Sequence, residues 1–230
     1  MASTITLQDV ALWATTFTKL IPIVGVGGYE NEPALSICNN VIQEMLSEPY
    51  NWKFNSKVAQ AFLTSTTLNT QDYQHNNTDL GWLESAIWVD PSSTQQPQPI
   101  GIVETVRNLQ PSSEVGGVPL KMANMFETDA GATFRLWPVP NMSKQWQIIP
   151  TYQIKAPIKS GLQETWSPIP DELAFVYRQG FLAEAYKHAD DPRADKEYQK
   201  FQLMMQKALG IKDMEANSES FLPDYGLFLG

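Results

Sequence analysis

The sequence has very few of the residues that build disulfide frameworks and metal centres. Its 230 residues include one cysteine, Cys38, and two histidines, His75 and His188. One thiol excludes an internal disulfide and a multi-cysteine zinc site, and two histidines leave little for a histidine-based metal centre. The lack of disulfides is typical of proteins that fold in a reducing compartment. We therefore expect neither a metal nor a cofactor.

Basic residues are also scarce. Sixteen Lys and Arg stand against 25 Asp and Glu, which gives a formal net charge of −9 and a pI near 4.7. This balance excludes a nucleic-acid binder that works by neutralising phosphates. The charge balance is still compatible with a protein that DNA passes without being tightly bound.

Near the N-terminus the sequence predicts neither a signal peptide nor a membrane span. No Lys or Arg precedes Lys19, and the apolar stretch from Val10 to Gly28 is interrupted by Lys19 and Pro22. A signal peptide begins with positive charge, and a membrane helix needs roughly 20 mostly apolar residues. Hydrophobic residues still make up 43% of the chain, which is enough to build the core of one large domain or two small ones.

Apolar residues recur at helical spacing at both ends of the chain. The pattern predicts helices over 7–21, 31–48, 168–186 and 192–209. The clearest stripe belongs to the second helix, and its apolar positions are Ala34, Leu35, Cys38, Val41, Ile42, Met45 and Leu46. Gly210 predicts the end of the fourth helix.

Between residues 64 and 166 the chain is rich in Thr, Ser, Asn, Gln, Gly and Pro, and short β-type runs alternate with turn signals. The runs lie at 82–89, 100–109, 120–126, 133–137, 145–149 and, more weakly, 153–158. Short antiparallel strands at this spacing favour a small sandwich or barrel.

The predicted fold class is therefore α+β: a helical bundle from both chain ends with an inserted antiparallel β-sandwich or barrel-like domain and an extended C-terminal arm. The predicted divisions are 1–58 for the N-terminal helices of the bundle, 59–166 for the inserted β domain, 167–211 for the C-terminal helices and 212–230 for the arm.

No arrangement of residues predicts a catalytic site. The segment Gly25 to Gly28 lacks the later glycine of a dinucleotide loop and the Gly-Lys-Ser/Thr ending of a phosphate loop, so we interpret it as a hinge. His188 with Asp190 and Asp191 crosses a helix end, where aspartate caps are ordinary. Cys38 lies on a core-facing stripe, and the sequence holds no G-x-S-x-G motif. The expectation is a protein that is not an enzyme.

Carbohydrate chemistry is an open alternative at this stage. Acidic residues such as Glu84 and Glu104 could act as paired carboxylates in glycoside hydrolysis, although their alternation with apolar neighbours favours a solvent face. Seven tryptophans in a β-rich chain also suggest a carbohydrate-binding protein, although tryptophans in strands can equally fill a core.

Two stretches, with strands between them, resemble a known family. The first, Ser36 to Asn55 (SICNNVIQEMLSEPYNWKFN), is an amphipathic helix followed by a Trp-x-Phe exit. The second begins at Phe134 to Pro140 (FRLWPVP), continues to Pro168 to Leu173 (PIPDEL) and ends with Asp191-Pro-Arg193 before a further helix. Over roughly residues 7–210, this order resembles the head-to-tail adaptor proteins of tailed bacteriophages, the group that includes the tail tubular protein A of podophages.

The resemblance implies a structural virion protein. Adaptors of this family combine helices with a β domain and form a dodecameric ring beneath the portal protein. The ring joins the portal to the tail, through a nozzle or tail-tube protein, and lines the channel through which DNA is ejected without being bound tightly. The implied location is the neck of the virion, after synthesis in the cytoplasm of the bacterial host, with no membrane involved. The family supplies no catalytic residues. A tail completion or terminator protein, or a carbohydrate-binding virion protein, is the alternative.

The C-terminus holds an apolar segment after a polar, acidic stretch. Its members are Phe221, Leu222, Pro223, Tyr225, Leu227, Phe228 and Leu229. Pro223 and Gly226 disfavour a helix and suit an extended arm. Together with the resemblance, which implies a portal as partner, this predicts an arm that binds the portal. The alternative is a tail folded back on its own helices.

Overall fold

The computed structural model describes residues 3–18, 31–58, 70–75, 78–89, 96–103, 109, 117–128, 131–139 and 147–210, without the side chains of residues 18, 75 and 126–128. The chain divides into two compact units. The first, here called the helical unit, is Met1–Phe54 with Ala156–Gly230, and the second, the sheet unit, is Asn55–Lys155. The divisions fall after residues 54 and 155, whereas the sequence placed them after 58 and 166.

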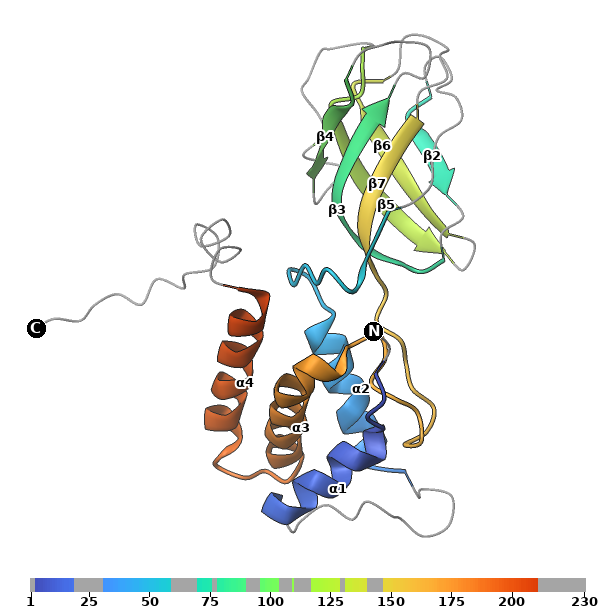
Figure 1. The fold of residues 1–230 in the computed structure, drawn as a ribbon. Helices are drawn as coiled ribbons and strands as arrows, with labels where there is room; N and C mark the ends of the chain where they lie inside the picture. The colour runs from blue at the N-terminus through green and yellow to red at the C-terminus, as the bar shows by residue number, and fades with distance from the viewer. Residues whose placement is uncertain are drawn as a thin grey trace, which may run out of the picture. The chain divides into compact units, whose positions relative to one another are not determined.

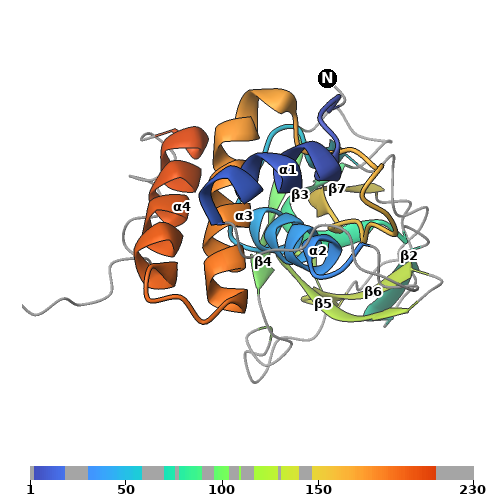
Figure 2. The same ribbon diagram turned by 90° about the horizontal axis from the view of Figure 1, so that it is seen from below.

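Within the described residues the helical unit contains four α-helices (Figure 1). They are α1 (Leu7–Thr18), α2 (Ala34–Met45), α3 (Ala174–His188) and α4 (Ala194–Leu209), and a short 3-10 helix, η2 (Asp171–Leu173), leads into α3. Each overlaps a segment whose periodicity predicted a helix, and α3 continues two residues past the predicted end at residue 186. Helix α3 contacts α1, α2 and α4, whereas α1 and α2 touch each other little. Figure 2 shows α3 beside α4, with α1 crossing near it.

The helical core is built from one face of each outer helix against α3. Helix α2 buries most of the predicted apolar stripe, but Ile37 is buried in addition and Leu35 only partly. Helix α4 buries only Phe201 and Met205. Trp166 and Tyr177 are fully buried and stack with ring centroids 4.3 Å apart. Because α4 buries so little, most of its surface stays available to solvent.

The start of the chain is fixed to the start of α3 by one carboxylate. Asp171 accepts hydrogen bonds from the Ser3 hydroxyl at 2.6 Å, from the Thr4 backbone N–H at 2.9 Å and from the Ile5 backbone N–H at 3.3 Å. These donors hold the pKa of Asp171 well below its ordinary value. Helix α1 then begins with a capping box, in which Thr6 and Asp9 each accept from the other's backbone N–H.

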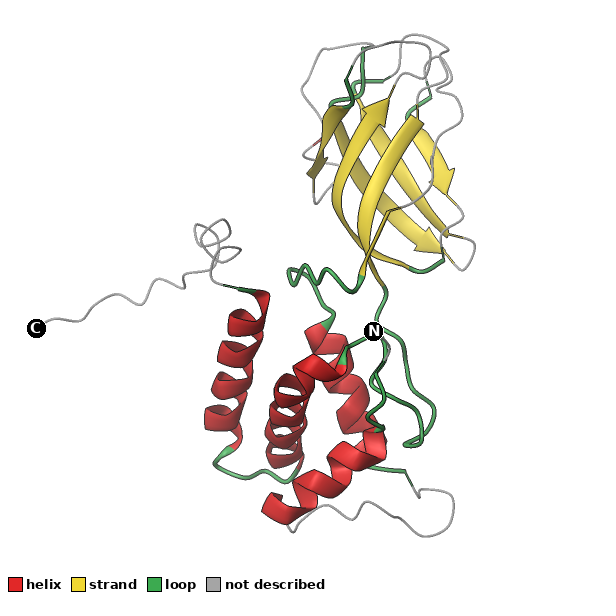
Figure 3. Cartoon of the chain, in the orientation of Figure 1, coloured by secondary structure: helices red, strands yellow, loops and turns green. Residues whose placement is uncertain are grey.

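The sheet unit is one curled, mixed sheet that forms a half-barrel (Figure 3). Its strands are β1 (Ser56–Val58), β2 (Asp72–His75), β3 (Leu80–Val89), β4 (Gln98–Val103), β5 (Lys121–Thr128), β6 (Gly131–Trp137) and β7 (Gln147–Ile154), in the order β1-β7-β3-β4-β5-β6-β2. All neighbours are antiparallel except β4 and β5, which are parallel. Alternate residues fill the concave side: Phe134 and Leu136 from β6 and Ile148 and Tyr152 from β7 are buried there.

The predicted fold class is wrong in its arrangement. The helices do not form a bundle from both chain ends but pack individually around α3, and the strands form one curled mixed sheet rather than an antiparallel sandwich or barrel. The physical reason lies at β4 and β5. A parallel pair needs a connection of a dozen or more residues, and β4 ends at Val103 whereas β5 begins only at Lys121. Strand periodicity alone does not distinguish such a pair from two strands of a hairpin. The extended arm of the prediction lies outside the described residues.

Gly180 allows α3 to pack tightly between α2 and α4. A Cβ atom at this position would lie 2.8 Å from Val41 Cγ1 of α2 and 2.8 Å from Phe201 Cε2 of α4. Both side chains are fully buried, so neither has free space into which it could move. Glycine is otherwise unfavourable in a helix, by about 1 kcal/mol relative to alanine. Close packing therefore explains its presence here.

We predict that Gly180→Ala lowers the free energy of unfolding, because overpacking of a closed core costs about 1–3 kcal/mol and exceeds the gain in helix propensity. Urea unfolding followed by the helical circular-dichroism signal measures the change. Gly161→Ala is the matched control, since a Cβ atom there meets nothing within 4 Å. Equal stability of the two variants would show that α3 does not depend on this close approach.

Candidate functional site

The predicted portal-binding residues lie outside the described part of the chain. This applies to all seven, Phe221, Leu222, Pro223, Tyr225, Leu227, Phe228 and Leu229, and to the glycine-rich segment and Glu104. The candidate site therefore has to be built from the surfaces of the described residues. The helical unit offers two such surfaces, one on α1 with α3 and one on α4.

The first surface is an exposed aromatic face. On α1, Leu12 is 50% and Phe17 54% exposed, and the ring of Trp13 lies 4.9 Å from that of Phe17. On α3, the guanidinium of Arg178 lies 5.7 Å from the Trp13 ring centre, and Phe175, one turn earlier on the same side of the helix, is 51% exposed. We call Leu12, Trp13, Phe17, Phe175 and Arg178 the aromatic face, in which Trp13 and Phe17 lie one turn apart on α1 and Leu12 lies farther round the same helix.

Two threonines make the surface of α1 more apolar than its sequence suggests. The Thr15 hydroxyl donates to the Leu12 carbonyl at 2.6 Å, and the Thr16 hydroxyl donates to the Trp13 carbonyl at 2.7 Å. Their polar groups are thus satisfied by the helix itself. Asp9 is the only charged residue of α1. A surface with few charges and several exposed large apolar side chains is typical of a site where another protein docks.

The second surface is a row of lysines on α4. Lys196, Lys200, Leu203 and Lys207 follow one another at spacings of four, three and four, which places them on one side of the helix. All four are exposed, Leu203 by 54%. Lys200 pairs with Glu197 of its own helix at 2.7 Å, but within the described residues Lys196 and Lys207 form no ion pair. We call these four residues the lysine stripe.

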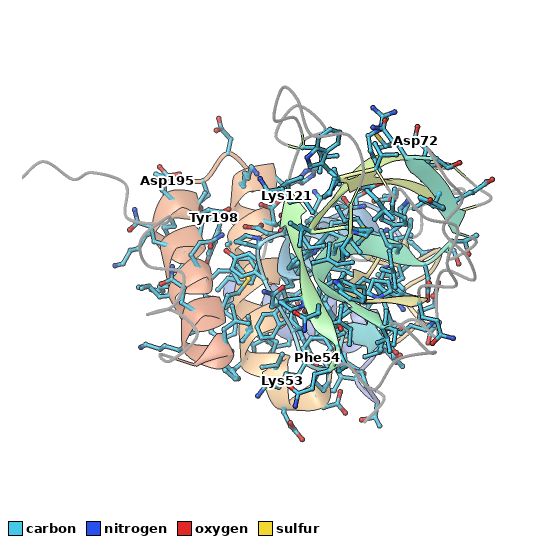
Figure 4. All side chains as sticks on the ribbon, turned by 90° about the horizontal axis from the view of Figure 1, so that it is seen from above. Lys53, Phe54, Asp72, Lys121, Asp195 and Tyr198 are labelled. Carbon is cyan, nitrogen blue, oxygen red and sulfur yellow. The ribbon has the colours of Figure 1, made fainter. Side chains whose placement is uncertain are left out.

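The opposite side of α4 is held by a partly buried polar network. The Glu44 carboxylate of α2 accepts hydrogen bonds from the Tyr198 hydroxyl and, at 2.7 Å, from the Gln202 side-chain amide. The Tyr50 hydroxyl donates to Gln202 at 2.8 Å, and Gln179 of α3 donates to the carbonyl of Glu197 at 3.0 Å. Tyr198 and Asp195 of α4 are labelled in Figure 4. Since these contacts and Phe201 face inward, the lysine stripe points away from α2 and α3.

The environment of Glu44 changes the protonation of its network. Burial is the main cause that raises the pKa of the Glu44 carboxyl above its ordinary value of 4.5, and the nearby Glu184 adds to it. Burial and the Glu44 carboxylate together raise the pKa of Tyr198 to about 12. The tyrosine therefore remains a hydrogen-bond donor at neutral pH.

A groove runs between α2 and the end of α3. Glu32, Ser36 and Asn40 line it from α2 and the residues before it, and Glu184, Lys187 and His188 line it from α3. Its volume is about 540 Å³. Lys187 pairs with Glu184 at 3.2 Å, which leaves Glu32 as the charge without an ionic partner among the described residues that line the groove.

The residues considered for catalysis or metal binding have structural roles where the structure describes them. Asp191 accepts hydrogen bonds from the backbone N–H and the guanidinium of Arg193, which lower its pKa to about 2 and shape the turn between α3 and α4. Cys38 is fully buried, and burial raises the pKa of its thiol. No group of three His, Cys, Asp or Glu side chains among the residues described could hold a metal ion.

Glu84 does not simply face solvent, as its alternation suggested. It accepts hydrogen bonds from the Ser56 hydroxyl at 3.0 Å and from the side chain of the fully buried Gln153. Next to it, Asp79 accepts from Lys57 at 2.7 Å and from the Tyr152 hydroxyl at 2.9 Å. These contacts fasten the short edge strand β1 to β7 and β3.

Comparisons with models of known protein families and with curated protein sequences give no match. No helix among the described residues is long and apolar enough to cross a membrane.

Neither surface was predicted from the sequence. The helix α4 was predicted from the apolar residues on its inward side. The lysines on its other side have a regular spacing in the sequence, but this spacing was not interpreted as a binding surface. The aromatic face was not predicted, because Phe17 has the helical spacing of the buried residues Leu7, Val10 and Ala14, and the sequence placed it in the core. That placement is wrong, since Phe17 is 54% exposed.

We predict that Glu44→Gln removes part of the pH dependence of stability. A carboxyl whose pKa is raised on folding binds a proton more readily in the folded state, so the wild-type protein gains stability as the pH falls from 7 toward 4.5. The variant keeps an acceptor oxygen but cannot titrate, and its gain should be smaller. Urea unfolding at pH 7 and pH 5, read by the helical circular-dichroism signal, measures the difference.

Glu48→Gln serves as the control, because Glu48 is exposed and outside the network. It should retain the wild-type pH dependence. A Glu44→Gln variant with the same pH dependence as the wild type would exclude Glu44 as the titrating group.

Proposed function

We propose that the protein is a structural component of a tailed-phage particle, a head-to-tail adaptor that joins the portal to the tail. The resemblance over residues 7–210 supplies the class of protein. The observation that favours an assembly role on the described residues is the aromatic face, because it exposes the large apolar side chains of Leu12, Phe17 and Phe175. A protein that works alone in water gains nothing from such a surface.

The proposed ring is formed through the helical unit. Both described candidate surfaces, the aromatic face and the lysine stripe, belong to this unit. A cyclic ring needs two different surfaces on each subunit, one that meets the preceding copy and one that meets the next. The lysine stripe on α4 is one exposed surface of the helical unit, and the exposed side of α2 and the aromatic face are others, so the unit has a different surface for each neighbour.

DNA is proposed to pass through the channel without tight binding. Each subunit carries a formal net charge of −9, and a ring of about twelve copies would present a strongly negative field. Phosphates are repelled by such a field, so the channel would not trap the genome. The proposed location is accordingly the neck of the virion.

The carbohydrate-binding alternative has little support from the described tryptophans of the sheet. Trp88 is 6% exposed, and Trp82 and Trp137 are partly buried, so none offers a fully exposed ring for a sugar to stack on. No described feature separately favours a tail completion or terminator protein.

The experiment that tests the proposal is to mix the purified protein with the portal protein of the same phage and image the particles by negative-stain electron microscopy. We predict a ring of adaptor density on the portal. A parallel sample truncated after Glu219 tests the proposed role of the apolar C-terminal segment: it should stay folded, with an unchanged thermal midpoint, but no longer co-sediment with the portal.

Portals that stay bare with the full-length protein would contradict the adaptor proposal. A truncated protein that loses stability while its folded fraction still binds the portal would assign Phe221 to Leu229 to the protein's own core instead.

A further inference from the structure

The charges of the helical unit are distributed unequally between its helices. In residues 3–18 and 31–48, which include α1 and α2, there are four carboxylates and no Lys or Arg. The carboxylates are Asp9, Glu32, Glu44 and Glu48. Helix α4, by contrast, carries three lysines, and all of them belong to the lysine stripe. The described residues at the start of the unit are thus purely acidic, whereas one side of its last helix is a row of exposed cations.

Among the described residues, the lysine stripe makes a single ion pair, between Lys200 and Glu197 of the same helix. It points away from α2 and α3, because Phe201, Tyr198 and Gln202 occupy the inward side of α4. Lys196 and Lys207 form no ion pair within the part of the chain that the structure describes. They lie eleven residues apart, which corresponds to about 16 Å along a helix at 1.5 Å per residue. The stripe is thus long enough to contact a whole helix of a partner.

The acidic side also has charge to offer to a partner. Glu48 is exposed, and Glu32 lies in the groove between α2 and α3. Between them, Ser36, Asn40 and Gln43 are exposed and uncharged. Lys187 of α3 lies in the same groove as Glu32, but its charge is paired with Glu184 at 3.2 Å. Glu44 is already engaged by α4 of the same chain and is not counted.

We propose that the lysine stripe of one subunit docks on the α2 surface of a second copy of this chain, around Glu32 and Glu48. The second copy is the occupant that charge favours, since its N-terminal helices carry the complementary sign and its net charge of −9 would otherwise repel a neighbour. Leu203, half-exposed in the middle of the stripe, and the lysine stems add apolar contact. The contact joins two different surfaces, so it is of the head-to-tail type that closes into rings.

This inference rests on the proposed ring, and it names the surfaces that hold neighbouring subunits together. It also has a signature of its own. Contacts between exposed charges weaken when salt screens them, over a Debye length that falls from about 30 Å at 0.01 M to about 10 Å at 0.1 M ionic strength. Self-association of the protein should therefore decrease as salt is added.

The test is charge reversal on both surfaces of the full-length protein. One variant is K196E/K200E/K207E and the other is E32K/E48K. Sedimentation velocity at about 0.01 M ionic strength measures self-association. Each variant alone should associate at least about tenfold more weakly than the wild type, whereas an equimolar mixture of the two should associate again, because the reversed surfaces then complement each other.

The matched control is K53E/K121E/K155E, which makes the same change in net charge at exposed lysines outside α4, two of them labelled in Figure 4. It should associate like the wild type. Circular dichroism and the thermal midpoint establish that each variant is folded, and K196Q/K200Q/K207Q, which removes charge without reversing it, should give an intermediate loss.

Three results would overturn the inference: a wild type that is monomeric at low salt, a stripe variant that associates like the control, or a mixture of the two reversed variants that fails to associate. Loss of duplex DNA binding by the stripe variant, with self-association intact, would assign the lysines to phosphates instead and overturn it as well.

The adaptor proposal is judged separately. If the K196E/K200E/K207E variant still forms rings on the portal, the adaptor proposal holds but the contact between the lysine stripe and α2 is wrong. If the protein associates with itself in a way that depends on salt and on the lysine stripe, but does not bind the portal, the contact holds and the adaptor proposal is wrong.

Discussion

The helical unit depends on a close approach at Gly180. The missing side chain lets Val41 of α2 and Phe201 of α4 pack against the same turn of α3. This contact sets how near α2 and α4 come to each other, and hence whether Tyr198 and Gln202 can reach Glu44. It also determines which side of α4 is outside. The lysine stripe is exposed because the buried side chains of α4, Phe201 and Met205, lie on the opposite side of that helix, with Phe201 at the Gly180 junction.

The helical unit and the sheet unit enclose their apolar cores in different ways. The sheet unit curls so that one face of a single sheet fills its own concave side, and its short edge strand β1 is fastened by Glu84 and Asp79. The helical unit closes its core around α3 but leaves an aromatic face and a lysine stripe exposed. Surfaces of this kind are costly for an isolated protein, because they favour association. They become useful when the protein works as one copy among many.

The sequence predicted the positions of helices and strands better than it predicted which strands pair with each other. The periodicity of α2 located its buried stripe, and Gly210 does end α4, with a positive φ of 88°. The run predicted at 82–89 lies within β3, and that at 133–137 lies within β6. The parallel pairing of β4 with β5 could not be predicted, since alternation says which face a residue takes and not which strand lies beside it. The strands β1 and β2, of three and four residues, were too short to give a pattern.

The candidate surfaces were still harder to predict. Leu12 and Phe17 are apolar residues on a helix, and a sequence cannot tell an apolar residue in the core from one left outside. The hydroxyls of Thr15 and Thr16 are satisfied by carbonyls of the same helix, a contact that exists only once the helix has formed. The lysines of α4 have a regular helical spacing in the sequence. Whether they face outward depends on the inward contacts of Tyr198 and Gln202, which only the folded structure shows.

The central claim is that subunits meet through their helical units, α4 of one copy against α2 of the next. Carbodiimide cross-linking of assembled protein, prepared from a mixture of isotope-labelled and unlabelled subunits, tests it most directly, because this reagent joins a lysine to a carboxylate only when the two are in contact. The account predicts mixed-label peptides that link Lys196, Lys200 or Lys207 to Glu32 or Glu48. Links between subunits that involve only residues 55–155, with the α4 lysines joined solely to their own chain, would contradict it.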